Sequence, residues 1–434
     1  MTSIATTLLA VLFGTLASGV WIGLTLIFTA VVLLYTFRSI PVDRLLPQYV
    51  FNILTTPELI ALPLFIVMGE FLFRTRLSRA LFDGLAPWAG LLPGRLLHVN
   101  VAGSSIFAAV SGSSAATTQV VGRIALSELE RRGYARPIAV GSLAGAGTLG
   151  FLIPPSTIMI IYGVLADESV LRLFTAGFVP GVLLALCFMA WIMVHTTIRP
   201  ELVPESERAL RHVSLGERLS ALRELAPVVA LIVAVLGSMY GGLATPSEAA
   251  AIGVVGAMII AAAQGGLTFA TLRDVALGSV QTCAMIGLIV LGASILGNVA
   301  AILGVPRAIA GFVEGLGLAP FALILVLMLV YLVLGCFLDG FSMIVMTLPV
   351  VLPLVAGAGF DTVWFGIFLV LVVEMSQITP PLGFNLFVIQ GLTGEGLMTI
   401  TRHTLPYLLI LVGFVVLMAL FPDIALFLPR LLLG

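Results

Sequence analysis

Long apolar runs separated by short charged stretches dominate the chain. A helix needs about 20 apolar residues to cross a bilayer. The charged stretch at residues 123–136 predicts a loop, and the amphipathic residues 77–88 and 267–278 predict short separate helices, the second lying along the membrane. Spans are predicted as two short ones within residues 4–37, then at 58–73, 173–196, 226–241, 247–263, 280–303 and 405–421. The pattern predicts an all-α polytopic membrane protein.

Four further apolar segments carry small, polar or helix-breaking residues at their centres. The first has Ser-Gly-Ser-Ser-Ala-Ala-Thr-Thr from Ser111, and the second is broken at Pro154-Pro155. The third has Phe-Leu-Asp-Gly-Phe-Ser from Phe337, and the fourth has Thr-Pro-Pro-Leu from Thr379. Such breaks are tolerated at membrane depth only where protein or a water-filled cavity covers the freed backbone groups. We therefore predict re-entrant hairpins at about residues 96–124 and 321–355, and broken helices at about residues 138–165 and 363–392.

The same markers recur at a nearly constant spacing. Pro154 and Pro380 are 226 positions apart, and so are Ser113 and Asp339. An amphipathic motif around Ser-Arg-Ala in the first half recurs around Pro-Arg-Ala in the second, at an offset of 228. Paired broken segments in two repeats indicate a transport site near the bilayer midplane. The predicted division is a first repeat at residues 1–198, a cytoplasmic connector at 199–225 and a second repeat at 226–434.

The arginines orient these repeats. We take residues 199–223 as cytoplasmic because they carry five arginines. Counting spans outward from them places 15 arginines on the cytoplasmic side and five on the other, with both termini outside. The first hairpin then enters from the cytoplasm and the second from the opposite face. The charge distribution therefore predicts an inverted repeat.

Composition excludes several classes of protein. The chain of 434 residues is 60% hydrophobic and only 9% charged, far below the roughly 25% charged residues of soluble domains. A net charge of −1 argues against a nucleic-acid partner. The three cysteines lie singly in apolar runs and the four histidines are scattered, which predicts no disulfide or metal framework. The chain has no Walker A motif, so we expect no ATP hydrolysis and no cofactor besides a coupling ion.

Unwound backbone at the two breaks predicts sites for Na⁺, which binds several hard oxygen ligands. Carbonyls at helix C-terminal ends supply such oxygens, and helix N-termini in the same breaks offer N–H groups to an anion. The first predicted site consists of Ser111, Ser114, Gly150, Ile153 and Pro155. The second predicted site consists of Phe337, Gly340, Ser376, Thr379 and Leu382. Residues expected near the ion or the substrate are Ser113, Asp339, Pro154 and Pro380. A simpler interpretation is that the small residues only let helices pack closely.

Acidic residues within spans are costly and usually functional. Glu70 and Glu248 lie near predicted span ends, where water can solvate them. Asp339 lies at a hairpin tip and Glu374 one turn before the second break, so both are candidates for the site. The scarcity of acids at midplane favours Na⁺ over H⁺ as the coupling ion.

The four interrupted motifs, taken with Thr-Leu-Pro at Thr347 and Gly-Phe-Asn-Leu-Phe after the second break, resemble the large membrane subunit of tripartite ATP-independent periplasmic (TRAP) transporters. The resemblance covers essentially the whole chain. It implies an elevator-type secondary transporter with a fold like that of the ion transporter superfamily, in a bacterial or archaeal inner membrane. It also implies Na⁺-coupled uptake of an organic acid, a periplasmic substrate-binding protein and a small four-helix membrane subunit on a separate chain.

Three other interpretations remain open from the residues alone. One is a stand-alone inverted-repeat dicarboxylate or citrate carrier, coupled to H⁺ or Na⁺. Another is an intramembrane protease with Ser111 as nucleophile, or with Asp339 and Glu374 as an acid pair. A serine enzyme needs a histidine within hydrogen-bond reach, and none is predicted at midplane depth. The last is a passive channel, which would not accumulate solute uphill.

Overall fold

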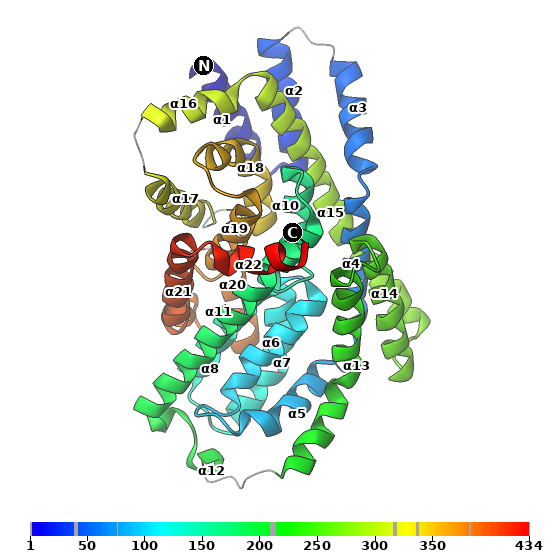
Figure 1. The fold of residues 1–434 in the computed structure, drawn as a ribbon, viewed down its shortest axis with the longest axis vertical. Helices are drawn as coiled ribbons and strands as arrows, with labels where there is room; N and C mark the ends of the chain where they lie inside the picture. The colour runs from blue at the N-terminus through cyan, green and yellow to red at the C-terminus, as the bar shows by residue number, and fades with distance from the viewer. Residues whose placement is uncertain are drawn as a thin grey trace.

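The computed structural model describes residues 2–38, 42–75, 77–208, 214–315, 319–335, 338–381 and 383–433, and all regular structure in these ranges is helical (Figure 1). The first half contains α1 (Thr2–Ala17), α2 (Ile22–Phe37), α3 (Val42–Leu54), α4 (Glu58–Phe73), α5 (Leu77–Ala89), α6 (Leu97–Ser111), α7 (Ser114–Arg131), α8 (Arg136–Gly147), α9 (Leu149–Leu152), α10 (Thr157–Ala166) and α11 (Val170–Ile198). The 3₁₀ turn η1 (Pro200–Leu202) and α12 (Glu205–Arg208) follow. The second half contains α13 (Leu215–Tyr240), α14 (Pro246–Ala263), α15 (Phe269–Ile302), α16 (Val305–Gly315), α17 (Pro320–Gly335), α18 (Gly340–Gly357), α19 (Thr362–Gln377), α20 (Phe384–Thr393), α21 (Leu397–Leu420) and α22 (Asp423–Leu433).

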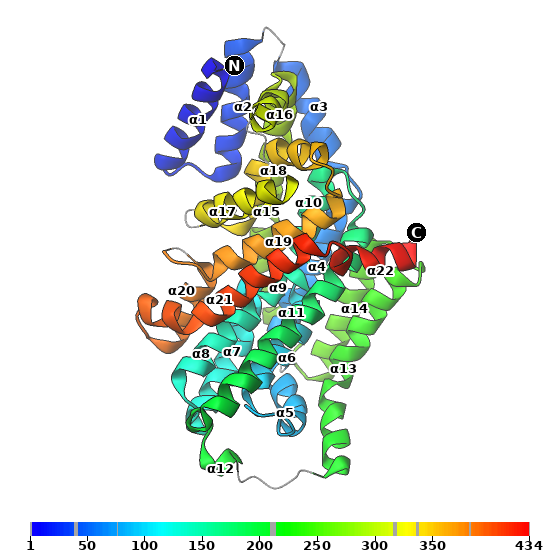
Figure 2. The same cartoon turned by 60° about the vertical axis from the view of Figure 1, so that its left-hand side comes forward.

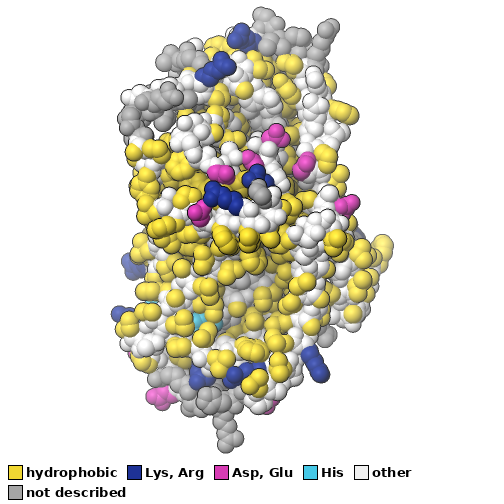
Figure 3. All heavy atoms as spheres, in the orientation of Figure 1, with side chains coloured by type: hydrophobic (Ala, Val, Ile, Leu, Met, Phe, Trp, Pro, Cys, Tyr) yellow, Lys and Arg dark blue, Asp and Glu magenta, His cyan; other side chains and the backbone are white. Residues whose placement is uncertain are grey.

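Many of these helices have the length and composition of membrane spans. In the described part of the chain, seven helices qualify, or eight when α3 and α4, bent by 54° at their junction, count as one span. Large apolar side chains face outward, among them Trp21, Leu243 and Phe269 at 74%, 84% and 84% exposure, and hydrophobic side chains cover much of the face in Figure 3. A surface of this kind suits lipid rather than water. The predicted all-α multi-pass membrane fold is confirmed.

Two local predictions are wrong. Residues 267–278 do not form a separate helix, because α15 starts at Phe269 and continues to Ile302 as one helix of 34 residues. The predicted charged loop at 123–136 is helical as far as Arg131, where Glu128 pairs with Arg131 and Arg132 one turn away. The end of the connector, for which no secondary structure was predicted, is helical, since Ser214 and Glu217 form a capping box that starts α13.

Both predicted hairpins form as pairs of helices with a capped second helix. Gly112 ends α6 in the left-handed conformation at φ +57°, and the Ser113 side chain accepts a hydrogen bond from the Ala116 N–H to cap α7. In the second hairpin, Asp339 caps α18 by accepting from the N–H groups of Phe341 and Ser342. The two residues that are offset by 226 positions therefore perform the same local task.

Equivalent elements of the two halves exchange partners. Helix α7 packs on α20 and α18 packs on α10, while α8 packs on α21 and α19 on α11. Outside this core, α4 packs on α14 and α15 on α2. Each pair joins a helix of the first half to a helix of the second half. If α7 is matched with α18 and α10 with α20, as the predicted repeat would have it, the α7–α20 contact and the α10–α18 contact correspond to each other. Figures 1 and 2 place the α6–α7 and α17–α18 hairpins on opposite sides of α19 along the long axis.

The α2–α15 contact is a direct approach of two backbones. A Cβ added to Gly23 would lie 2.6 Å from the Leu288 carbonyl oxygen, and one added to Gly292 would lie 2.5 Å from the Gly23 carbonyl oxygen. Both positions therefore need glycine. By contrast, Gly253 of α14 meets α4 through the flexible Met68 side chain, whose sulfur would lie 2.5 Å from an added Cβ.

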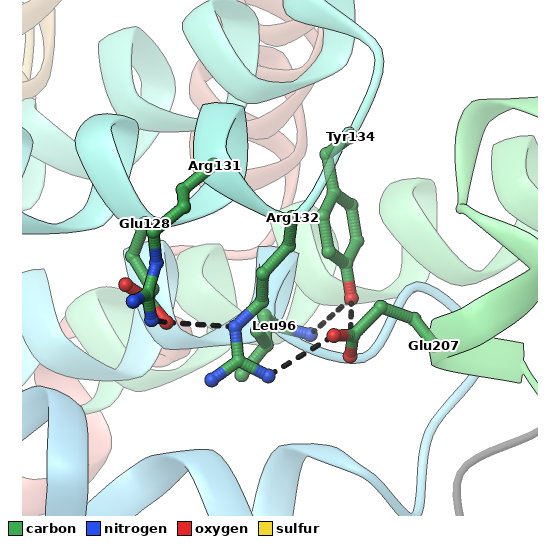
Figure 4. A network of polar contacts seen from close by, with 6 residues as sticks. All are labelled: Leu96, Glu128, Arg131, Arg132, Tyr134 and Glu207. Carbon is green, nitrogen blue, oxygen red and sulfur yellow. Dashed lines mark hydrogen bonds and ion pairs between the residues drawn. The ribbon is translucent and has the colours of Figure 1, made fainter.

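A polar network holds the start of the connector against the base of the first hairpin (Figure 4). Glu207 of α12 is 6% exposed and lies 3.0 Å from Arg132 Nη1, while the Tyr134 hydroxyl donates to it across 3.4 Å. The same hydroxyl accepts from the Leu96 N–H. Burial, together with the Glu207 charge, raises the pKa of Tyr134, so its hydroxyl remains a donor.

We expect Glu207→Gln to destabilise the fold modestly, because it removes the charge facing Arg132 while Glu128 still pairs with that arginine. The loss should be about 1 kcal/mol, since Arg132 is partly solvated. Differential scanning fluorimetry in detergent measures it as a lower apparent melting temperature. Glu205→Gln, at an exposed position of the same helix, is the matched control. An equal effect in both variants would contradict a stabilising role for the network.

Candidate functional site

The tip of the first hairpin touches the first helix break through backbone atoms. A Cβ added to Gly150 would lie 2.5 Å from Ser114 Cα and 2.6 Å from the Ser113 carbonyl oxygen. The Gly112 carbonyl accepts a hydrogen bond of 2.8 Å from the Thr157 hydroxyl. The structure thus brings together the two segments from which the first Na⁺ site was predicted.

The predicted ligands of the first site lie on both sides of this contact. Ser111 ends α6, with its hydroxyl 2.9 Å from that of Thr117. Pro155 lies against the tip, since its carbonyl oxygen would be 2.9 Å from a Cβ on Gly112. Ile153 ends α9 in an extended conformation, where its carbonyl leaves the helical ladder. Their geometry permits a shared site, and ion binding there stays a prediction.

The Pro-Pro pairs explain why carbonyls are available at both breaks. In a helix, each carbonyl accepts from the N–H four residues later, and proline has no N–H. Pro154 therefore leaves the Gly150 carbonyl without its helical donor. Pro380 does the same for Ser376, whose carbonyl accepts instead from the Thr379 N–H at 3.2 Å. Both Pro-Pro peptide bonds are cis. In the Arg136–Ala166 span, which contains the first break, 83% of an apolar 18-residue window is buried within the protein, as unwound backbone at membrane depth requires.

The second hairpin approaches the second break in a similar way. A Cβ added to Gly335 would lie 2.1 Å from Ser376 Cβ, and one added to Gly340 would lie 2.5 Å from Val373 Cγ1. The hydroxyls of Ser376 and Thr379 donate to carbonyls of their own helix, at 2.6 and 2.7 Å. Backbone oxygens are the groups this break offers to a cation. Phe337 and Leu382, also predicted as ligands, lie outside the described residues.

The two candidate sites are neighbours. The rings of Phe151, in the first break, and Phe341, in the second hairpin, pack edge to face with centroids 5.6 Å apart. Ile158 Cδ1 would lie 3.3 Å from a Cβ on Gly340. Hairpin and break segments from both halves therefore meet in one region, as Figure 2 shows for α9, α10, α18 and α19.

Glu374 links the halves within this region. Its side chain is completely buried in α19. The carboxyl Oε2 lies 2.8 Å from the Ser114 hydroxyl, and Oε1 accepts from the Phe151 N–H at 2.7 Å. Asn385 of α20 donates to the same Ser114 hydroxyl at 2.8 Å. Sequence reasoning identified Glu374 as a candidate acid and quoted the motif that contains Asn385 without assigning it a role.

The other candidate residues have structural partners. Asp339 is exposed at the second tip, and its carboxylate caps α18. Glu70 lies 3.5 Å from Arg74, and Glu248 forms a capping box with Thr245 at the start of α14. These last two acids occupy helix ends, as their sequence positions predicted. Pro154 and Pro380 each begin a Pro-Pro pair, and Ser113 is half-buried at the first tip.

Solved structures with a similar fold belong to membrane transporters. The YdaH transporter of Alcanivorax borkumensis superposes with a TM-score of 0.57 at 15% identity, covering 87% of each chain. MtrF of Neisseria gonorrhoeae, described within a class of antimetabolite efflux pumps, gives a TM-score of 0.56 at 13% identity, covering 88% of this chain and 83% of that one. At these identities the likeness concerns the fold alone, which is a polytopic helical one.

Sequence similarity identifies the family. The profile of the tripartite ATP-independent periplasmic transporter, DctM component, matches residues 9–424, and the chain belongs to this family. The C4-dicarboxylate TRAP transporter large permease protein DctM of Pseudomonas aeruginosa is 35% identical over 373 residues, which is 86% of each chain. The sialic acid TRAP transporter large permease protein SiaM of Vibrio cholerae is 29% identical, covering 97% of each chain.

A longer relative is also similar. The isethionate TRAP transporter permease protein DctMQ of Oleidesulfovibrio alaskensis is 31% identical over 424 residues, covering 96% of this chain and 66% of that protein. The resemblance expected from the four motifs is confirmed. The family consists of transporter permease subunits, so the chain is not an enzyme and the protease interpretation is discarded.

We expect Gly150→Ala to destabilise the protein by about 1–3 kcal/mol, because its Cβ would overlap the backbone of the hairpin tip. The measurement is the apparent melting temperature in detergent. Gly287→Ala in α15, where nothing lies within 4 Å of an added Cβ, should leave it unchanged. If the two variants melted alike, the close approach of tip and break would be refuted.

Proposed function

We propose that this chain is the permease subunit of a secondary-active, Na⁺-coupled TRAP transporter that imports an organic acid. The observation that carries the proposal is the contact between the Gly112–Ser114 turn and the broken helix at Gly150 and Pro155. Relatives named for C4-dicarboxylate, sialic acid and isethionate support an organic acid as substrate.

The donor set of each break fits a hard monovalent cation. Carbonyl and hydroxyl oxygens are available and no thiolate is needed. In the first site, Na⁺ would be held by Ser111, Ser114, Gly150, Ile153 and Pro155. In the second, it would be held by Phe337, Gly340, Ser376, Thr379 and Leu382. The N-terminus of α7, capped by the neutral Ser113, lies at the first tip, where first-turn N–H groups suit an anionic substrate. At α18 the Asp339 carboxylate already accepts from the first-turn N–H groups.

Transport would proceed by an elevator movement of one part of the chain against another. In this proposal the two repeats are inverted, and the hairpins and broken helices, α6–α11 and α17–α22, carry both sites. Helices α1–α4 and α13–α15 form the scaffold. The reciprocal packing of α7 with α20 and α18 with α10 supports a mobile core that moves as a unit, and the α2–α15 and α4–α14 contacts support a separate scaffold.

Two protein partners follow from the same proposal. A periplasmic substrate-binding protein delivers the acid to the outward face, and a small four-helix membrane subunit on a separate chain completes the permease in a bacterial inner membrane. The alignment of this chain with 66% of the longer DctMQ protein supports a permease that has a further part.

Reconstitution with the small subunit and a binding protein should give uptake of candidate acids only under an inward Na⁺ gradient. Radiolabelled dicarboxylates, sialic acid and isethionate would be compared in proteoliposomes. Full-rate uptake of free acid without the binding protein would instead favour a stand-alone carrier. Uptake driven by a proton gradient alone would refute Na⁺ coupling, and equilibration without accumulation would indicate a channel.

We also expect Ser114→Leu or Gly150→Leu to lower Na⁺-dependent uptake by about tenfold or more, because a bulky side chain separates the ligands of the first site. These variants should still insert into the membrane, which is measured with a fluorescent protein fused to the C-terminus. Gly413→Leu, with nothing within 4 Å of an added Cβ, is the control. Wild-type uptake by either of the first two variants would count against the first site.

A further inference from the structure

The first candidate site is held together from the other half of the chain. Ser114 at the hairpin tip and Phe151 in the first break are joined by one side chain, Glu374, which is 260 and 223 positions away in sequence. Asn385, on the far side of the second break, donates to Ser114 as well. Both flanks of the second break therefore contact a predicted ligand of the first site.

Hydrogen bonding at the break shows what Glu374 replaces. In an uninterrupted helix, the Phe151 N–H would point at the Gly147 carbonyl, four residues earlier. Here that N–H donates to Glu374 Oε1, and the Gly147 carbonyl lies 3.0 Å from the Ser114 hydroxyl. Glu374 and Ser114 together take the place of the helical bond. The spacing between tip and break is set by this bridge.

The arrangement is not mirrored at the second site. Subtracting the offset of 226 from Glu374 and Asn385 gives Thr148 and Met159. The Thr148 hydroxyl bonds to the Gly145 carbonyl of its own turn, and methionine offers no comparable donor. The bridge between halves belongs to the first site.

We propose that Glu374 is a positioning residue for the first cation site, acting through its two hydrogen bonds to Ser114 and Phe151 rather than through its charge. This inference rests on the proposed Na⁺ coupling. It follows that cation binding at the first site is linked to the positions of α19 and α20. A shift of either helix pulls on Ser114, and a cation that holds Ser114 in place resists the shift.

Three substitutions of Glu374 distinguish the effect of its side-chain length and hydrogen bonds from the effect of its charge. Glu374→Gln keeps the length: its carbonyl accepts from Phe151, and its amide donates to Ser114, whose single hydroxyl hydrogen then serves Gly147. Glu374→Asp keeps the acidic group but is one methylene shorter. Glu374→Met keeps the length and removes both hydrogen bonds. The aspartate variant, which keeps a polar carboxyl group among the hydrogen-bonding partners, keeps the test decisive if the methionine variant does not fold.

Hydrogen–deuterium exchange mass spectrometry would be performed on the full chain in nanodiscs with its co-expressed small subunit, at increasing NaCl balanced by choline chloride. The first readout is exchange at residues 111–118 and 147–153 without Na⁺. The second is the Na⁺ concentration that gives half-maximal protection of these peptides. Residues 338–342, at the second tip, are the internal control.

Without Na⁺, the methionine and aspartate variants should exchange faster at residues 111–118 than the wild type. Their half-maximal Na⁺ concentration should rise by about tenfold or more, as for other residues that orient cation ligands. Glu374→Gln should match the wild type in both measurements, and the second tip should keep its response in all variants.

The inference is overturned if glutamine is as damaging as methionine, which would assign the role to charge, or if aspartate matches the wild type. Unchanged exchange at residues 111–118 in the methionine variant would also overturn it. A wild-type protein whose tips do not respond to Na⁺ would refute the proposed coupling instead. Exchange in the absence of Na⁺ would still decide whether Glu374 positions the tip.

Discussion

Backbone hydrogen bonding in a medium without water is the constraint on which this structure depends. Pro154 and Pro380 each remove a donor from a helix that sits deep in the protein. The freed carbonyls are acceptable only because hairpin tips and neighbouring helices enclose them. The approach of Gly150 to the tip at Ser114, possible only without a side chain, provides that enclosure on one side. In the proposed function, the same carbonyl groups that would destabilise a lipid-facing helix serve as ligands for the coupling ion.

The two helix breaks are enclosed by backbones of similar arrangement but by different side chains. Serine caps the first hairpin and aspartate caps the second, at equivalent positions. A buried carboxyl group, Glu374, serves the first break, whereas the second is packed with apolar groups such as Val373 against Gly340. Similar local geometry at the two breaks therefore does not imply similar chemistry.

Much of this architecture could be predicted from residue order, because helix breaks in lipid are rare and proline and glycine mark them. Helix pairs lie at both predicted hairpin positions, and helices end just before both Pro-Pro pairs, as the residue order indicated. The continuity of α15 was not predicted, because the pattern predicts that a short separate helix ends at Gly278. In the structure its missing side chain makes room for the Glu70 carboxylate, one oxygen of which lies 3.1 Å from where a Cβ would be. The bridge from Asn385 to Ser114 depends on packing between segments 271 positions apart, and no local pattern carries that information.

The contact of Gly23 and Gly292 has a consequence for how the chain acquires its structure. At this point no side chain separates the two backbones, so α2 and α15 depend on each other for a close fit. Helix α2 is made early and its partner much later, so the first half of the chain leaves the ribosome with this part of α2 uncovered. The first half of the chain is therefore not an autonomous folding domain. The pairing of α2 with α15 must wait until synthesis has passed Ile302, where α15 ends.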